Sequence, residues 1–150
     1  NQMVSFSVGM TFVYGGITVG LPLEKTVLFF GLLAAMLDLG EEIAADAMDM
    51  QGDKEINSNS LAIKFGRVTA LRISSFIFGF VIILTIIPFV VGWFEPQYFI
   101  PFVFMDAIII YSVVNLLKSN GDEGRGYIKW IYRSSTATIL AFLVMRLIGV

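Results

Sequence analysis

The sequence predicts an all-α fold, a polytopic membrane helix bundle with about five transmembrane helices. Of its 150 residues, 57% are hydrophobic and 15% are charged, whereas about a quarter of the residues in a soluble domain are charged. A helix needs roughly 20 apolar residues to cross a bilayer. Five segments approach that length, and we expect residues 1–150 to form a single transmembrane region. The segments are residues 3–21, 26–45, 68–92, 98–117 and 130–149.

The connections between these segments differ in charge. Most of the Lys and Arg residues lie in or beside the second and fourth connections, where positive-inside statistics predict cytoplasmic loops. We therefore expect a multi-pass protein of the cell membrane with both connections in the cytoplasm. The fourth connection, KSNGDEGRGY, is rich in glycine and is expected to form a flexible turn. The basic residues concerned are Lys54, Lys64, Arg67, Arg72, Lys118, Arg125, Lys129 and Arg133.

Composition also excludes several kinds of chemistry. The chain has no histidine and no cysteine, which rules out imidazole bases, thiolate metal sites and disulfides within it. The net charge is only −2, and no nucleic-acid partner is expected. Any metal bound by side chains of this chain must therefore be held mainly by oxygen ligands.

An acidic stretch, residues 37–56, follows directly on the apolar run of the second segment. At about 100° per residue, five carboxylates of a continuous helix project within an arc of roughly 80°. Like charges at this spacing repel each other and need a counter-charge. Mg²⁺ is a suitable one, because it binds one or two carboxylates together with water and substrate phosphates. The five are Asp38, Glu42, Asp46, Asp49 and Asp53.

Other interpretations of the acidic stretch remain open at this point. It could be a solvated helix end, or part of a purely structural subunit. Carboxylates inside a membrane also serve proton- or cation-coupled transport, with Asp106 of the fourth segment as a possible partner. The spacing of Asp46, Asp49 and Asp53, followed by a polar loop, favours a metal site.

The residues EEIAADAMDMQGDKEINSNSLAIKFG, 41–66, resemble the second aspartate-rich motif of the UbiA-type intramembrane prenyltransferases. The D-x-x-x-D element of the motif corresponds to Asp49 and Asp53, and Asp46 is the aspartate that precedes it. SLAIKFG, residues 60–66, occupies the closing position of the loop. Within the family, the pattern is most similar to the archaeal digeranylgeranylglyceryl phosphate synthases.

The resemblance implies a fold with nine helices and two aspartate-rich motifs. Only the second motif and about five helices occur here, so the chain looks like the C-terminal part of such a fold. The missing N-terminal half, which carries the first motif, is then an expected partner. Glu41, Ala45 and Asn59 replace basic residues that are frequent in the family, and Ala62 replaces a proline.

The activity implied by the resemblance is Mg²⁺-dependent transfer of a geranylgeranyl group from prenyl diphosphate to a hydroxyl of geranylgeranylglyceryl phosphate. Alternatives are a quinone or other aromatic acceptor, and a cation-coupled transporter fragment. The resemblance assigns catalysis to three aspartates, which also bind metal together with Glu42. The aspartates are Asp46, Asp49 and Asp53, and the substrate-binding candidates are Lys54, Ser60, Lys64 and Arg67.

Two expectations concern helix packing. Small residues in the first segment, within SVGMTFVYGG, favour close helix contacts. Asp106, Tyr111 and Asn115 in the fourth segment are expected to form bonds between helices rather than to bind substrate.

Overall fold

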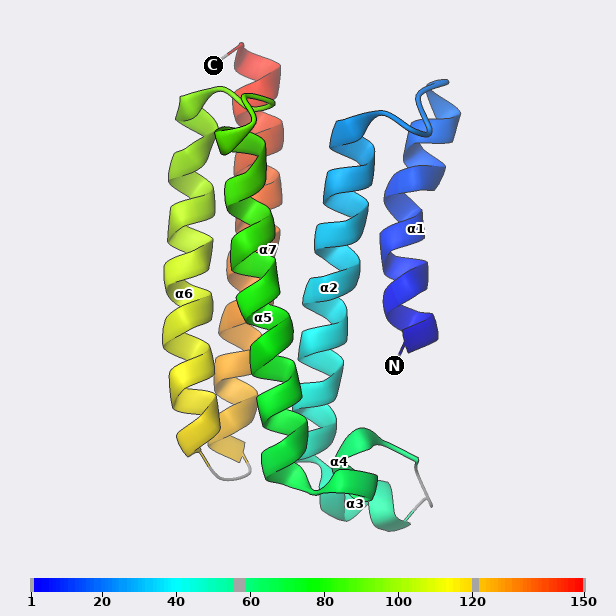
Figure 1. The fold of residues 1–150 in the computed structure, drawn as a ribbon, viewed down its shortest axis with the longest axis vertical. Helices are drawn as coiled ribbons and strands as arrows, with labels where there is room; N and C mark the ends of the chain where they lie inside the picture. Colours follow the sequence, from blue (N-terminus) through cyan, green and yellow to red (C-terminus); the bar gives the residue numbers. More distant parts are fainter. Residues whose placement is uncertain (1, 56–58, 120–121, 150) are drawn as a thin grey trace.

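The computed structural model describes residues 2–55, 59–119 and 122–149, except for the side chains of Gln51, Asp53 and Asp122. Five long helices run along the same axis, and short helices lie at both ends (Figure 1). The long helices are α1 (Gln2–Thr18), α2 (Lys25–Met48), α5 (Arg67–Val90), α6 (Phe99–Lys118) and α7 (Asp122–Ile148). The short ones are α3 (Met50–Glu55), α4 (Leu61–Phe65) and the 3₁₀ turn η1 (Pro96–Tyr98).

The all-helical bundle predicted from hydropathy is confirmed, with a long helix at each of the five expected positions. Among the described residues, three helices are long and apolar enough to cross a membrane: α5, α6 with its preceding turn, and α7. Helix α1 has 17 residues, which is short for a span. Helix α2 has 24 residues, but Asp38, Glu41 and Glu42 make its second half polar.

The prediction of a flexible turn at KSNGDEGRGY is wrong for the second half of that segment, because α7 already begins at Asp122. Glu123 places negative charge in the first turn of the helix, where the helix dipole favours it. Gly124 is buried against Met48 and Ser119, and a Cβ atom added there would collide with both side chains. The first turn of α7 is therefore packed closely against α2, although the local composition predicts no helix there.

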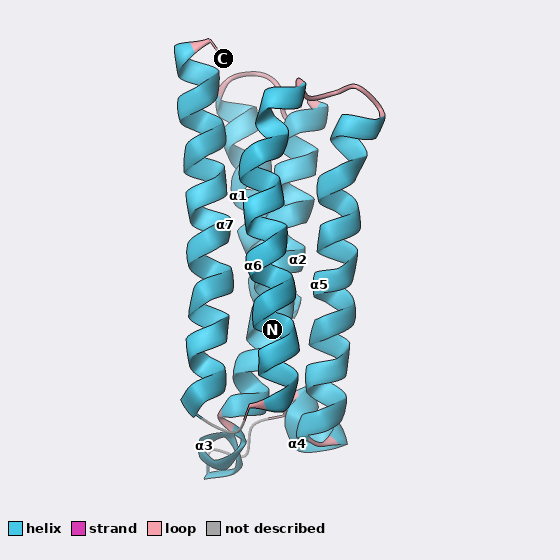
Figure 2. Ribbon diagram, turned by 90° about the vertical axis from the view of Figure 1, so that its left-hand side faces the viewer, coloured by secondary structure: helices cyan, strands magenta, loops and turns pink. Residues whose placement is uncertain are grey.

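The helix ends divide the molecule into two poles. One pole, here called the aspartate end, holds the end of α2, helices α3 and α4, the start of α5, the end of α6 and the start of α7 (Figures 1 and 2). The opposite pole holds the α1–α2 and α5–α6 connections and the end of α7. The second and fourth connections thus share one end of the bundle, as the positive-inside prediction requires.

Helix α2 lies at the centre, packed against α1, α5 and α7. Lipid tails are as apolar as the helix surfaces, so interhelical packing and polar contacts hold such a bundle together. Among the described residues, four hydroxyl groups donate hydrogen bonds between helices. They are Ser5 to Asp38 Oδ2 (2.7 Å), Ser74 to the Gly40 carbonyl (2.7 Å), Thr85 to Asp106 Oδ2 (2.8 Å) and Thr138 to the Pro101 carbonyl (3.1 Å).

The three polar residues of α6 that were expected to bond between helices behave differently in the structure. Asp106 does so through Thr85 of α5. Tyr111 contacts the ring of Tyr127 on α7, with ring centroids 6.2 Å apart. The expectation is wrong for Asn115, whose amide donates to the Tyr111 carbonyl of its own helix at 2.8 Å. That local bond satisfies the amide without any neighbouring helix.

Glycines set the distance between α1 and α2, as the small residues of the first segment predict. A Cβ atom added to Gly9 would lie 2.7 Å from the carbonyl oxygen of Gly31, and one added to Gly31 would lie 3.0 Å from that of Gly9. These obstacles are backbone atoms, which cannot rotate away as a side chain can. The two helices therefore cross at a distance that only glycine permits.

Gly9→Ala is expected to destabilise the protein by about 1–3 kcal/mol, the usual range for overpacking. Gly15→Ala is the matched control, because Gly15 lies on the same helix with no atom within 4 Å of an added Cβ. The control should be neutral or more stable by up to about 1 kcal/mol, since alanine favours helix. Thermal unfolding of the full-length protein in detergent measures both, and equal stability of the two variants would contradict the close crossing.

Candidate metal and substrate site

The aspartate end begins where α2 stops. Helix α2 ends at Met48, and Asp49 leaves the helical conformation with φ −110° and ψ 20°. Its amide still donates to the carbonyls of Ala45 and Asp46, and α3 starts at the next residue. The prediction of one continuous helix through Asp53 is therefore wrong.

Electrostatics gives a reason for the break at Asp49. Negative charge is unfavourable at the C-terminal end of a helix and favourable at the start of one. By interrupting the helix, the chain places Asp49 directly before α3, a position where aspartate is a preferred residue. Gly52 leaves room for the carboxylate, because a Cβ atom there would lie 3.2 Å from Asp49 Oδ1.

Asp49 forms an ion pair with Arg125 in the first turns of α7. The distance between Arg125 Nη2 and Asp49 Oδ1 is 3.0 Å, and both side chains are more than half exposed. The sequence indicated that the acidic stretch needs a counter-charge, but it did not identify Arg125 as that residue. The two residues are far apart in the sequence and meet only because the second and fourth connections share one pole.

The other acidic candidates occupy different environments. Asp46 and Glu42 are half-buried along α2. Asp38, the first member of the predicted stripe, accepts the hydroxyl hydrogen bond of Ser5 on α1. Asp38 thus takes part in helix packing, whereas Asp49 contacts α7. Asp53 is a residue of α3 whose side chain lies outside the described set.

Helix α4 closes the loop that follows the aspartates. The Ser60 hydroxyl oxygen accepts from the Ile63 amide at 3.4 Å and caps the start of the helix. Gly66 ends the helix with φ 81°, a conformation that side chains with a Cβ rarely adopt. The helix places Lys64, which is exposed, next to Ser60.

A groove of about 690 Å³ runs beside α4 between α1, α2 and α5. Its wall is apolar, and its rim near α4 is polar. Ile43 lies on the wall, and Asp46 follows three residues later on the same face of α2. Asp46, a predicted metal ligand, is thus three residues from a lining residue of the groove but does not itself line it. Its lining residues are Gln2, Met3, Leu39, Ile43, Asn59, Ser60, Leu61, Lys64, Ile73 and Ile77.

The remaining basic candidates have different surroundings. Arg67, at the start of α5, donates from Nη2 to the Ser119 carbonyl and contacts Met48 Sδ at 3.5 Å. It thereby ties the end of α6 to the end of α2. Lys54 is exposed on α3. Ser60 and Lys64 line the groove together, whereas Lys54 and Arg67 are not among its lining residues.

The donor set suits a hard cation. Among the described side chains, no group of three His, Cys, Asp or Glu residues is close enough to hold a metal ion alone. Mg²⁺ does not need such a cage, because it commonly takes one or two carboxylates and completes its shell with water and phosphate oxygens. Asp46 and Asp49 supply hard oxygen ligands in a chain without histidine or cysteine, so the residues present fit part of a magnesium site.

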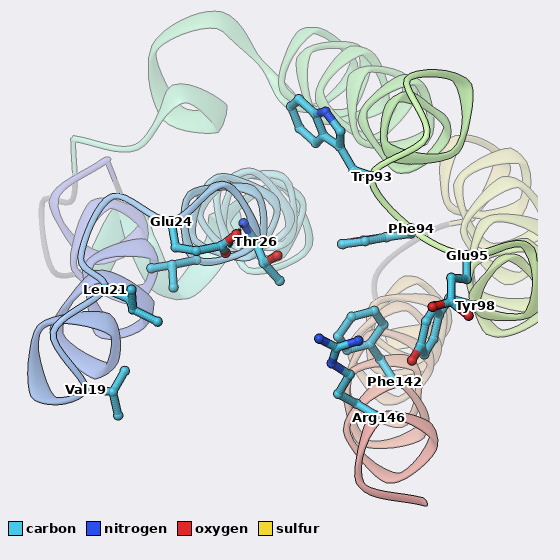
Figure 3. A pocket seen from close by; sticks show the side chains of 11 residues that line it. Val19, Leu21, Glu24, Thr26, Trp93, Phe94, Glu95, Tyr98, Phe142 and Arg146 are labelled. Atoms are coloured by element: carbon cyan, nitrogen blue, oxygen red, sulfur yellow. Dashed lines mark hydrogen bonds between the residues drawn. The ribbon is translucent and has the colours of Figure 1, made fainter. Parts of the chain in front are cut away.

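A second cavity, of about 510 Å³, lies at the opposite pole (Figure 3). Phe94 and Tyr98 approach it from the α5–α6 connection, Phe142 and Arg146 from α7, and Glu24 from the start of α2. None of the predicted site residues lines this cavity. It is therefore separate from the aspartate end.

The UbiA prenyltransferase family model matches residues 1–145. This chain belongs to the UbiA prenyltransferase family. Membership in this family, together with the apolar helices α5, α6 and α7, makes it an integral membrane protein. The family resemblance predicted from the motif in residues 41–66 is thereby confirmed.

Curated UbiA relatives share their printed name, digeranylgeranylglyceryl phosphate synthase. The Methanocaldococcus jannaschii protein is 30% identical over 146 residues, covering 96% of this chain and 50% of its own length. The Methanococcus maripaludis C7 protein is 29% identical, covering 96% and 51%. The Haloquadratum walsbyi protein is 28% identical, covering 100% and 51%. The chain spans about half the length of these relatives.

A solved structure supports the same grouping. It concerns digeranylgeranylglyceryl phosphate synthase in membranes and superimposes with a TM-score of 0.86 at 28% identity. The match covers 96% of this chain and 51% of the solved one. The UbiA helix arrangement therefore extends over nearly the whole chain.

Proposed function

We propose that the protein containing this chain transfers a geranylgeranyl group from prenyl diphosphate to a hydroxyl of geranylgeranylglyceryl phosphate. The similarity to relatives of that name over 96% or more of the chain supports this activity. The observation that carries it here is local. Asp46 and Asp49 lie at the end of α2. The groove at this end combines apolar side chains of α2 and α5 with the polar Ser60 and Lys64 of the α4 segment, as a lipid substrate with a phosphate group requires.

Asp46, Asp49 and Asp53 are the proposed metal ligands on this side of the site, with Glu42 as an additional one. A magnesium ion held by these residues would supply positive charge against the negative charge that develops on the leaving diphosphate. The chain's own contribution is to fix the carboxylates where the diphosphate binds. In this proposal, the remaining ligands come from the part of the enzyme that corresponds to the half of the relatives' length that this chain does not cover.

The proposed reaction breaks the bond between C1 of the prenyl group and the diphosphate oxygen, and the electron pair leaves with diphosphate. The glycerol hydroxyl oxygen forms the new bond to C1 and releases its proton. The apolar wall of the groove, including Leu39, Ile43 and Ile77, keeps water from the reacting carbon. Exclusion of water protects a reactive intermediate from hydrolysis.

The proposed orientation places the aspartate end in the cytoplasm of a cell-membrane protein. Most basic residues of the chain lie in or beside the connections at this end, as the positive-inside rule requires of cytoplasmic loops. Charged, water-soluble diphosphate is then released on the side where the metal site lies.

Lys64 and Ser60 are proposed to contact a substrate phosphate at the rim of the groove. Lys64→Gln is expected to raise KM for the phosphate-bearing acceptor by about 10-fold, the equivalent of one hydrogen bond to a charged group. Lys129→Gln is the control, because Lys129 is exposed on α7 and does not line the groove. Steady-state kinetics of the full-length protein measure both. Equal KM values would exclude Lys64 from the acceptor site.

The acceptor assay tests the proposed function. Full-length protein in liposomes receives labelled geranylgeranyl diphosphate and either geranylgeranylglyceryl phosphate or an aromatic carboxylic acid with a free ring position. The proposal predicts an ether lipid product with the first acceptor. Product formed only with the aromatic acid would favour the aromatic alternative. Cation flux without any prenyl product would favour the transporter.

A further inference from the structure

We propose that Arg125 is a substrate-binding residue, which contacts the diphosphate of the prenyl substrate when the site is loaded. The inference deepens the proposed function and rests on it. In the structure, Arg125 is the ion-pair partner of Asp49, at 3.0 Å. A metal–diphosphate group bound at Asp49 would arrive within reach of the same guanidinium.

The first turns of α7 are held at the aspartate end by several contacts. Gly124 packs directly against Met48, the last residue of α2, in a space that a side chain would fill. Arg67 bonds to the Ser119 carbonyl just before α7, and the ring of Tyr127 contacts Tyr111. These contacts fix the backbone on both sides of Arg125, so its position beside Asp49 follows from the packing of three helices.

Stability alone gives little reason for the ion pair. Arg125 is 51% exposed and Asp49 is 60% exposed, and ion pairs with this exposure are weakened by water and salt. The pair does neutralise a carboxylate in a strongly acidic segment. A bound divalent cation would neutralise the carboxylate instead, and the positive charge of Arg125 would then be available for the diphosphate.

The chemistry of arginine suits binding to diphosphate. Its guanidinium carries five N–H donors in a planar fork that matches phosphate oxygens. Nη2 forms the ion pair with Asp49, and a guanidinium with five donors has further N–H groups that can bind diphosphate without losing the aspartate. A charge-assisted bond to diphosphate is stronger than a neutral one, and it strengthens as negative charge develops on the leaving group.

The test uses full-length protein with Arg125→Gln, Arg125→Lys and the control Arg133→Gln. Arg133 is an exposed arginine on the same helix, two turns further on. The first readout is calorimetric binding of inorganic diphosphate in the presence of Mg²⁺, which requires no turnover. The second is KM for geranylgeranyl diphosphate. We expect Arg125→Gln to raise both the dissociation constant for diphosphate and the KM for geranylgeranyl diphosphate by about 10- to 100-fold. This is the usual loss for a hydrogen bond between charged groups.

Arg125→Lys should bind diphosphate with intermediate strength, because it keeps the charge and loses the fork. Equal binding by Arg125→Gln and Arg133→Gln would overturn the inference, as would wild-type protein that does not bind diphosphate. If wild-type protein binds diphosphate through Arg125 but forms no prenyl product, the proposed function fails while the assignment of Arg125 stands. The Lys variant keeps the test valid if the Gln variant does not fold.

Discussion

Asp49→Asn is expected to reduce turnover of the full-length protein by about 10²- to 10³-fold, the usual effect of losing a group that stabilises transition-state charge. Asparagine keeps the shape of the side chain but removes the negative charge that holds Mg²⁺. The fold should survive, because Asp49 is exposed at the end of α2 and its ion pair with Arg125 is also exposed. Excess Mg²⁺ should restore part of the activity if only metal affinity is lost.

Asp53→Asn is expected to behave in the same way, as its position in the D-x-x-x-D motif predicts. Glu123→Gln is the control, because Glu123 is an exposed carboxylate close to Arg125 in the sequence that has no proposed role in the site. Initial rates at saturating Mg²⁺ compare the variants. Wild-type rates in both aspartate variants would contradict the catalytic role and favour the interpretation of the acidic stretch as a solvated helix end.

Removal of divalent cations is expected to reduce prenyl transfer to the background rate, and added Mg²⁺ should restore it. The donor set of Asp46 and Asp49 contains only oxygen, the ligand type that Mg²⁺ prefers. Without the cation, the leaving diphosphate would meet carboxylates of the same charge. The measurement is product formation after chelation, followed by titration with MgCl₂ and, as a control, with NaCl at equal ionic strength.

Undiminished transfer in protein shown by elemental analysis to contain no divalent metal would contradict the magnesium assignment. Recovery of prenyl transfer with Na⁺ alone would show that the site does not require a divalent cation. Either result would contradict the magnesium assignment within a single titration.

The positions of the long helices could be predicted because a bilayer imposes a minimum apolar length. That constraint acts on each segment separately and needs no knowledge of the neighbours. The small residues around Gly9 were also informative, since a close helix crossing leaves a local signature. The side of the bundle shared by the second and fourth connections followed from their basic residues.

The details of the aspartate end depend on contacts between distant residues. Periodicity continues the helix through Asp49, but the charge at the end of α2 and the start of α3 favours a break there. The composition around Gly124 suggests a turn, whereas packing against Met48 accompanies a helix. Arg125 could have been identified by asking which cation on the same side of the membrane neutralises the acidic stretch.

The most direct measurement of the central claim is the stoichiometry of bond cleavage by the full-length protein. Geranylgeranyl diphosphate labelled in both the prenyl group and the diphosphate is incubated with geranylgeranylglyceryl phosphate and Mg²⁺ in liposomes. The proposed function predicts one diphosphate released for each ether lipid formed, and neither product without Mg²⁺. Recovery of the intact prenyl diphosphate, with the acceptor unchanged, would contradict it.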